Sequence, residues 1–118
     1  MELSIIIPIY NEEGNLPKLY DRLTKVANSL NVSYELIFVN DGSRDNSLPL
    51  IISFANQDKH VKYINFSRNF GHQIAVTAGI DYCKGEAVAI IDADLQDPPE
   101  LILELYKKME EGYHSNLA

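Results

Sequence analysis

The sequence has little that would mark a secreted, membrane-embedded or nucleic-acid-binding protein. Cys83 is its single cysteine, so no disulfide can form within the chain, and a reducing, cytosolic setting fits. No apolar run approaches the roughly 18 residues of a membrane span, and the N-terminus has neither the basic segment nor the cleavage site of a signal peptide. The net charge of −7, without a cluster of Lys and Arg, argues against nucleic acid as a partner.

Two glycine-rich nucleotide-binding motifs are absent as well. No G-x-G-x-x-G follows the first apolar segment, which argues against a Rossmann dinucleotide-binding domain, and there is no P-loop. What remains is an ordinary globular composition, with 46% hydrophobic residues and neither low-complexity tracts nor internal repeats. A length of 118 residues fits one domain or a piece of one.

Apolar segments of strand length alternate with segments of helical period along the chain. We expect strands at 3–9, 34–40, 61–66 and 86–92. The expected helices begin near Asn15, Asp45 or Asn46, Gly71 and Asp97, and the last ends at Gly112. This alternation, with nearly all-apolar strands, predicts an α/β fold with a mainly parallel sheet and helices on both faces.

The spacing of apolar residues also predicts which helix faces are buried. The third helix is expected to carry Ile74, Ala75, Ala78 and Tyr82 on one face, and the last helix is expected to turn Leu101, Leu105 and Met109 inward.

Polar residues follow each expected strand. They are Tyr10, Asn11 and Glu12, then Asp41, Gly42 and Ser43, then Ser67, Arg68 and Asn69, and finally Asp92, Asp94 and Gln96. Since ligands of parallel α/β sheets bind at the carboxyl ends of the strands, this edge is the candidate site.

The acidic pair after the last strand points to a metal ion. Asp92 and Asp94 are separated by one small residue, and in extended backbone such side chains point the same way. Two neighbouring carboxylates repel unless a proton or cation lies between them, and hard oxygen ligands suit Mg²⁺ or Mn²⁺. Gln96 can add a neutral oxygen, whereas Asp97 is better explained as a helix cap. A lone D-x-D would indicate only a solvated loop; its place after a buried strand favours a site.

Four ordered segments together resemble a known family. "IIIPIYNEE", "FVNDGSRDNS", "FSRNFGHQIAVTAGIDYCKGE" and "IDADLQDPPE" are similar to the N-terminal half of family 2 glycosyltransferases, which have the GT-A fold with its Rossmann-like nucleotide-binding half. Within the family the likeness is to polyprenyl-phosphate sugar transferases, such as dolichol-phosphate mannose synthase and the undecaprenyl-phosphate glycosyltransferases. It covers roughly residues 3–113.

The resemblance implies a nucleotide-binding role for several residues. Pro8, Tyr10 and Glu12 match the family's first nucleotide-binding loop, where the acidic group reaches ribose hydroxyls. Asp41 matches the aspartate that hydrogen-bonds the base; a carboxylate accepts N–H groups, as uracil and guanine both offer. Taken alone, Pro8 could simply end a strand and Asp41 could simply form a turn before a glycine.

The resemblance also implies how the diphosphate is held. Asp92 and Asp94 match the family's metal-binding D-x-D, with Asp92 also at the nucleotide and Gln96 in the metal shell. Arg68 matches a basic residue near the diphosphate, although alone it could be a surface arginine. His72 stands where relatives often carry lysine, and we place it at the edge of the site.

The implied reaction transfers a sugar from a UDP- or GDP-sugar to a polyprenyl phosphate, with inversion and with Mg²⁺ or Mn²⁺. Residues 1–118 would form the donor-binding part, because the family's domain continues further with an acceptor half and often with membrane segments. We therefore expect a cytoplasmic protein, at the cytoplasmic membrane face in a full-length form. Catalysis by this chain alone is doubtful, and exposed sheet edges favour self-association.

Two other functions stay open. The chain can be a non-catalytic nucleotide-binding or scaffolding fragment that needs a partner chain. A phosphoacceptor receiver domain is less favoured, because Asn11, Glu12 and Glu13 follow the first strand and Ser67 and Arg68 the third, where receivers carry an acidic pair and the acceptor aspartate.

Overall fold

The computed structural model describes residues 1–96 and 98–110. In this part the strands are β1 (Leu3–Ile9), β2 (Tyr34–Asn40), β3 (Val61–Asn65) and β4 (Ala87–Ile90). They form one parallel sheet in the order β3-β2-β1-β4. β1 and β2 are buried at every position, which explains their continuous apolar sequences. In each of the two edge strands only the first residue is buried, and the rest are half-buried or exposed. The predicted parallel α/β fold is confirmed.

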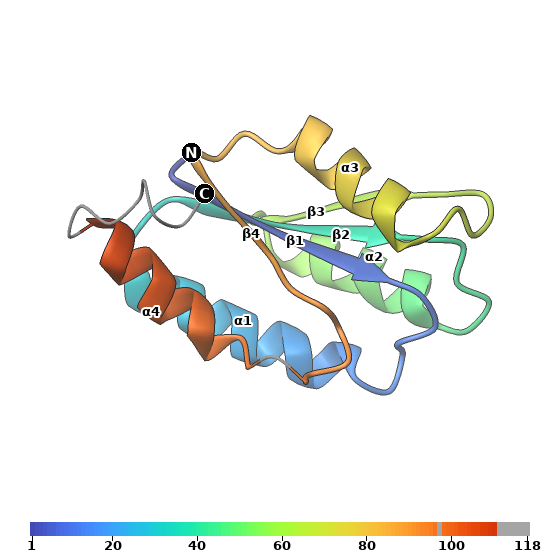
Figure 1. The fold of residues 1–118 in the computed structure, drawn as a ribbon. Helices are drawn as coiled ribbons and strands as arrows, with labels where there is room; N and C mark the ends of the chain where they lie inside the picture. Colours follow the sequence, from blue (N-terminus) through green and yellow to red (C-terminus); the bar gives the residue numbers. More distant parts are fainter. Residues whose placement is uncertain (97, 111–118) are drawn as a thin grey trace.

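Helices cover both faces of the sheet, as predicted (Figure 1). One face carries α1 (Leu16–Leu30), α2 (Ser47–Gln57) and α4 (Glu100–Lys108), and the other carries α3 (His72–Tyr82). The larger core lies between the sheet and the first three helices, and a smaller one beneath α3. The residues expected to cap and end the last helix, Asp97 and Gly112, lie outside the described residues.

Helix α2 shows how a local sequence fixes the start of an element at the site. Asn46 is its N-terminal boundary residue, but its side chain makes no capping bond. Instead a carboxylate oxygen of Asp45 accepts a hydrogen bond of 2.9 Å from the backbone N–H of Ser47. The preceding residue therefore satisfies one of the free donors at this helix start.

The apolar face predicted for α3 is buried only in part. Ile74 and Tyr82 are exposed, and the buried positions are Ala75 and Gly79. A Cβ atom at Gly79 would lie 2.5 Å from Cγ2 of Ile6, so the helix packs through its smallest residues. The side of α3 that is buried is the side where small residues let the helix backbone approach the sheet closely, and the spacing of apolar residues does not reveal it.

The predicted inward face of α4 is also wrong in part. Ile102 is the buried residue of this helix, and Met109 is half-buried against the core. Leu101 and Leu105 are exposed. Helix α4 lies under the edge strand β4, so the residues on its outer side have no further strand above them in the described part (Figure 1).

A buried polar cluster closes the amino-terminal end of the sheet. Glu35 at the start of β2 is 1% exposed. One of its carboxylate oxygens accepts hydrogen bonds from the hydroxyl of Ser4 at 2.6 Å and the backbone N–H of Lys84 at 2.8 Å. The Ser4 hydroxyl accepts a bond of 2.8 Å from the N–H of Gly85. These bonds fix the connection between α3 and β4 against the sheet.

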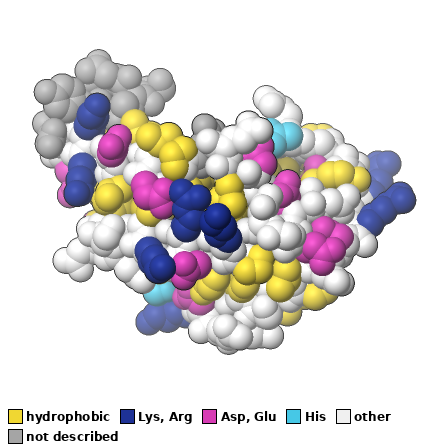
Figure 2. All heavy atoms as spheres, turned by 90° about the horizontal axis from the view of Figure 1, so that it is seen from below, with side chains coloured by type: hydrophobic (Ala, Val, Ile, Leu, Met, Phe, Trp, Pro, Cys, Tyr) yellow, Lys and Arg dark blue, Asp and Glu magenta, His cyan; other side chains and the backbone are white. Residues whose placement is uncertain are grey.

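The helical face of the molecule has a mixed surface. Figure 2 shows Lys and Arg side chains interspersed with Asp and Glu, and apolar side chains in patches between them. None of the helices in the described part has both the length and the apolarity to cross a bilayer.

Candidate functional site

A cavity of about 520 Å³ opens at the carboxyl ends of β1, β2 and β4. Six of the predicted site residues line it, namely Pro8, Tyr10, Glu12, Asp41, Asp92 and Asp94. Asn69, Gly71 and His72 complete much of its wall. Segments that are far apart in the sequence thus meet at one edge of the sheet, as the parallel topology requires.

The loop after β1 is tied to the loop after β2. Asn11, with a φ of 53°, donates its backbone N–H to the Ser43 hydroxyl at 2.9 Å. Its side-chain oxygen accepts from the N–H of Arg44 at 2.8 Å. One residue on, the N–H of Glu12 donates to the Ser47 hydroxyl at 2.9 Å. These bonds fix the backbone beside Tyr10 and Glu12, so both residues sit on a preorganised wall of the cavity.

The carboxylate of Glu12 is partly engaged. One of its oxygens accepts a bond of 2.8 Å from the side-chain amide of Asn15, just before α1. A carboxylate has several acceptor positions, so Glu12 keeps capacity for hydroxyl donors in the cavity.

Asp41 is 3% exposed and holds the loop between β3 and α3 in place. Its carboxylate accepts hydrogen bonds from the backbone N–H of Phe70 at 2.7 Å and of Gly71 at 3.0 Å. The side-chain amide of Asn69 donates to the same carboxylate at 3.2 Å. Asp41 therefore shapes the entry to α3, and it also lines the cavity.

The residue after Asp41 is Gly42, and the same loop crosses directly over it. Its φ is 72°, and an added Cβ would lie 2.2 Å from the carbonyl carbon of Arg68. Both the backbone conformation and the close approach require glycine. Asp41 and Gly42 thus hold the loop after β2 against the loop between β3 and α3.

Asp92 and Asp94 project from the end of β4 on the same side. Burial alternates here: Ile91 and Ala93 are buried, whereas the two aspartates are exposed. Both carboxylates thus face the cavity as predicted, but the predicted extended backbone is wrong at this point, because β4 ends at Ile90 and the chain turns at Ala93 and Asp94. A carboxylate oxygen of Asp94 accepts a bond of 3.1 Å from the backbone N–H of Gln96, after Leu95 turns the chain at a φ of 64°.

His72 contacts the acidic pair directly. Its Nε2 atom lies 2.9 Å from a carboxylate oxygen of Asp92. His72 is the first residue of α3, which places its side chain at the end of the sheet where β4 ends. The sequence reasoning put this residue at the edge of the site without a role, and the contact gives it one: it orients Asp92.

Two predicted site residues lie outside the cavity lining. The guanidinium carbon of Arg68 lies 4.5 Å from the ring centroid of Phe70, in a cation–π contact. Gln96 is exposed and meets the site only through its backbone bond to Asp94. Their proposed roles at the diphosphate and the metal stay predictions.

The fold is that of the GT-A glycosyltransferases. The crystal structure of S. aureus TarS 1–349 superposes with a TM-score of 0.68 at 23% identity, covering 96% of this chain and 33% of that one. The mannosyltransferase PcManGT of Pyrobaculum calidifontis superposes with a TM-score of 0.60 at 21% identity, covering 82% of this chain and 33% of that one.

The sequence narrows the class further. The family described as glycosyl transferase family 2 matches residues 4–118, and the chain belongs to this family of transferases. The uncharacterized glycosyltransferase YkcC of Bacillus subtilis is 54% identical over 96% of this chain and 35% of its own length. An undecaprenyl-phosphate 4-deoxy-4-formamido-L-arabinose transferase of Shewanella sediminis is 46% identical over 96% of this chain and 34% of its own. The chain thus spans about a third of these relatives.

Proposed function

We propose that this chain is the donor half of an inverting, metal-dependent glycosyltransferase that binds a UDP- or GDP-sugar and passes the sugar to a polyprenyl phosphate. One observation carries the proposal. Six of the eight residues that the family resemblance assigned to the nucleotide and the metal, drawn from three separate loops, line a single cavity.

The nucleoside would lie between the loops after β1 and β2. Asp41 and Glu12 offer carboxylate oxygens for the N–H groups of a base and for ribose hydroxyls. Tyr10 is exposed at the rim, where its ring can lie against the nucleotide. Uracil and guanine both present N–H donors, so Asp41 alone does not choose between them.

The acidic pair fits a divalent cation at the diphosphate. Asp92 and Asp94 supply hard oxygen donors on one side of the chain. In residues 1–96 and 98–110, no group of three or more His, Cys, Asp or Glu residues converges on one point. A Mg²⁺ or Mn²⁺ ion here would therefore share its shell with water and with the phosphate oxygens of the donor, as Mg²⁺ commonly does.

When bound, the cation supplies Lewis-acid stabilisation for the departing diphosphate. The protein's own contribution is positioning: the loop bonds of Asn11 and Asp41 hold the walls, and His72 orients Asp92. An acceptor that is already an anionic phosphate hardly needs a general base.

Similar proteins agree with this proposal and leave the base of the nucleotide open. TarS has a structure in complex with UDP-GlcNAc, and PcManGT one with GDP-Man and Mn²⁺. A relative at 46% identity is named as an undecaprenyl-phosphate transferase. These names support a nucleotide-sugar donor and a lipid-phosphate acceptor.

A second function stays open beside the first. Residues 1–118 correspond to about a third of these relatives, and by themselves they can bind the nucleotide without catalysing transfer. Both functions share the donor site and differ only in activity.

Calorimetric titration with UDP and with GDP, each with and without Mn²⁺, tests the proposal. We expect Mn²⁺-dependent binding of one nucleotide, weakened about tenfold or more in Asp94→Asn. Asp81→Asn is the matched control, since it removes a carboxylate from the exposed end of α3 outside the cavity and should bind normally. If a folded chain binds neither nucleotide, the proposal fails. If binding ignores Mn²⁺ and Asp94→Asn, the metal part of it fails.

A further inference from the structure

Two contacts between a histidine ring and an aspartate carboxylate occur in the described part of the chain, and their surroundings differ. The Nδ1 atom of His60 lies 2.8 Å from a carboxylate oxygen of Asp58, and these side chains are 34% and 16% exposed. The Nε2 atom of His72 lies 2.9 Å from a carboxylate oxygen of Asp92, and these side chains are 61% and 52% exposed. Of the two pairs, the second lines the cavity of the candidate site.

Other groups already engage the pair of His60 and Asp58. The Tyr20 hydroxyl donates to the Asp58 carboxylate at 2.7 Å, and the backbone N–H of His60 donates to it at 3.0 Å. The ring of His60 stacks on the ring of Tyr34, with the centroids 4.1 Å apart. These contacts explain this pair as part of the packing around the turn between α2 and β3.

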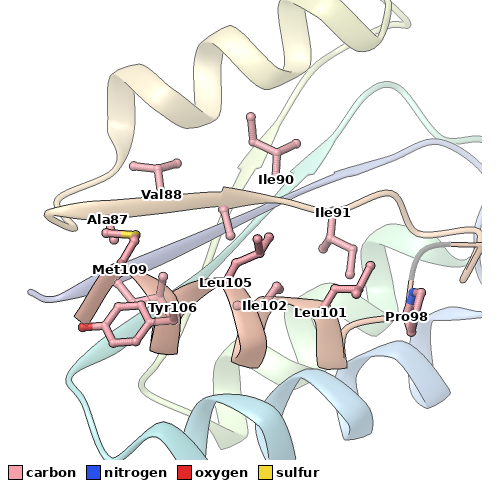
Figure 3. Close-up of a pocket in the computed structure, with 12 residues that line it drawn as sticks. Ala87, Val88, Ile90, Ile91, Pro98, Leu101, Ile102, Leu105, Tyr106 and Met109 are labelled. Atoms are coloured by element: carbon pink, nitrogen blue, oxygen red, sulfur yellow. The ribbon is translucent and has the colours of Figure 1, made fainter. Parts of the chain in front are cut away.

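The pair of His72 and Asp92 has the spacing of two ligands on one ion. In an octahedral shell with ligand atoms about 2.1 Å from the ion, neighbouring ligand atoms lie about 3 Å apart. The 2.9 Å between Nε2 of His72 and the Asp92 oxygen matches this spacing. Figure 3 shows Ile91 pointing towards α4 and Ile90 pointing away from it. Asp92 comes next and contacts the first residue of α3, on the other face of the sheet.

We infer that His72 is a further ligand of the divalent cation and biases the site towards Mn²⁺ over Mg²⁺. The inference rests on the donor function proposed above and adds the choice of metal to it. Mg²⁺ takes oxygen ligands, whereas an imidazole nitrogen is a common ligand of first-row transition ions. The ligating nitrogen carries no proton, so the ring holds its proton on Nδ1 in the complex.

The rest of the metal shell comes from other groups. No group of three His, Cys, Asp or Glu residues converges in the part of the chain that the structure describes. The pair of His72 and Asp92 is therefore the preorganised part of the shell. The exposed Asp94, water and the phosphate oxygens of the donor complete it.

Pulsed EPR of Mn²⁺ bound to the whole chain, with whichever of UDP and GDP binds, tests the ligand directly. A coordinated ring nitrogen modulates the electron spin echo, and ¹⁵N-labelling of the histidines alone distinguishes it from nitrogens of the base. We expect a histidine nitrogen signal in wild type and its loss in His72→Gln. His60→Gln is the matched control and should keep the signal, because its pair with Asp58 lies outside the cavity.

Calorimetric titration with Mn²⁺ and with Mg²⁺, in the presence of the same nucleotide, measures the metal preference. The preference for Mn²⁺ should fall about tenfold in His72→Gln, which offers an amide oxygen in place of the ring nitrogen, and should be unchanged in His60→Gln. Circular dichroism shows that both variants are folded.

The failure of this inference is distinguishable from the failure of the donor function. If Mn²⁺ and the nucleotide bind without a histidine nitrogen signal, or if His72→Gln keeps the wild-type metal preference, the inference is overturned and the donor function stands. If folded wild type binds neither nucleotide, both are overturned.

Discussion

Two buried carboxylates lie at opposite ends of the same strand and differ in their surroundings. Glu35 is the second residue of β2 and is 1% exposed, and Asp41 directly follows the strand and is 3% exposed. Each accepts backbone N–H groups from a loop that leads into the next element, at Lys84 in one case and at Phe70 and Gly71 in the other. Only Asp41 also lines a cavity with further acidic groups. Burial of a carboxylate alone thus marks a loop anchor, and function comes from what else that loop encloses.

Glycine substitutions beside the two carboxylates should have the largest effect. Gly42→Ala adds a Cβ 2.2 Å from backbone of the crossing loop, at a φ of 72°. We expect a loss of about 3 kcal/mol or more in the free energy of unfolding, measured by urea denaturation. Gly85→Ala should cost less, because its Cβ would clash with Ser4 at 2.5 Å but its φ is not positive.

Gly14→Ala is the control for both substitutions, since an added Cβ there meets no atom within 4 Å. It should change stability by less than about 1 kcal/mol. If Gly42→Ala were as mild as Gly14→Ala, the tight crossing over Gly42 would be wrong.

Neutralising the two carboxylates should separate anchoring from binding. In Asp41→Asn, the NH₂ group of the new side chain faces N–H donors that bond to a carboxylate oxygen in the wild type. We therefore expect a loss of about 1–3 kcal/mol in the free energy of unfolding and about tenfold weaker nucleotide binding. Glu35→Gln can keep its accepting oxygen towards Ser4 and Lys84, so it should cost about 1 kcal/mol or less and leave binding unchanged. Binding is measured by calorimetry on samples shown to be folded by circular dichroism. Equal binding by the two variants would contradict the assignment of Asp41.

The smallest expected effect is on stability at low pH, and it again compares the two ends of the sheet. Burial opposes ionisation of Asp58, near the amino end, but hydrogen bonds from Tyr20 and His60 outweigh it and hold its pKa below the ordinary value. Desolvation likewise opposes ionisation of Asp45, at the carboxyl end, and bonds from Ser47 and Glu13 hold its pKa low.

A lowered folded-state pKa gives stability that is complete above the unfolded value of about 3.9 and is lost as the pH falls through the folded-state pKa. We expect the urea midpoint to fall between about pH 5 and pH 3. Asp58→Asn should flatten this fall more than Asp45→Asn, because the side chains of two residues, Tyr20 and His60, bond to its carboxylate. Identical profiles for both variants and wild type would contradict these assignments.

The sequence predicted the sheet and the site better than the helix faces. Continuous apolar runs reveal a buried parallel strand directly, and the strand order then brings the polar strand ends together. The face of α3 was mispredicted because packing there runs through Gly79, and a search for apolar period gives glycine no weight. The face of α4 was mispredicted because Leu101 and Leu105 line an open edge and not a closed core.

Within the candidate site, the sequence predicted which residues lie around one cavity where a residue follows its strand directly. Asp92 and Asp94 come just after β4 and alternate in burial with Ile91 and Ala93, so both reach the cavity. Arg68 lies in a loop, and its stacking on Phe70 depends on a turn that no pattern in the sequence reports. The contact of His72 with Asp92 joins two elements that are neighbours only after folding, so the sequence could suggest its place but not its partner.

The most direct test of the account maps a bound metal along the sheet by NMR. Mn²⁺ titrated into the ¹⁵N-labelled chain with the preferred nucleotide broadens amide signals near the ion. The account predicts selective loss of the signals of His72, Ala93 and Asp94, while those of Ser4, Glu35 and Gly85 at the opposite end persist. Broadening centred on Glu35, or spread evenly over the acidic surface, would contradict a donor site at the carboxyl edge.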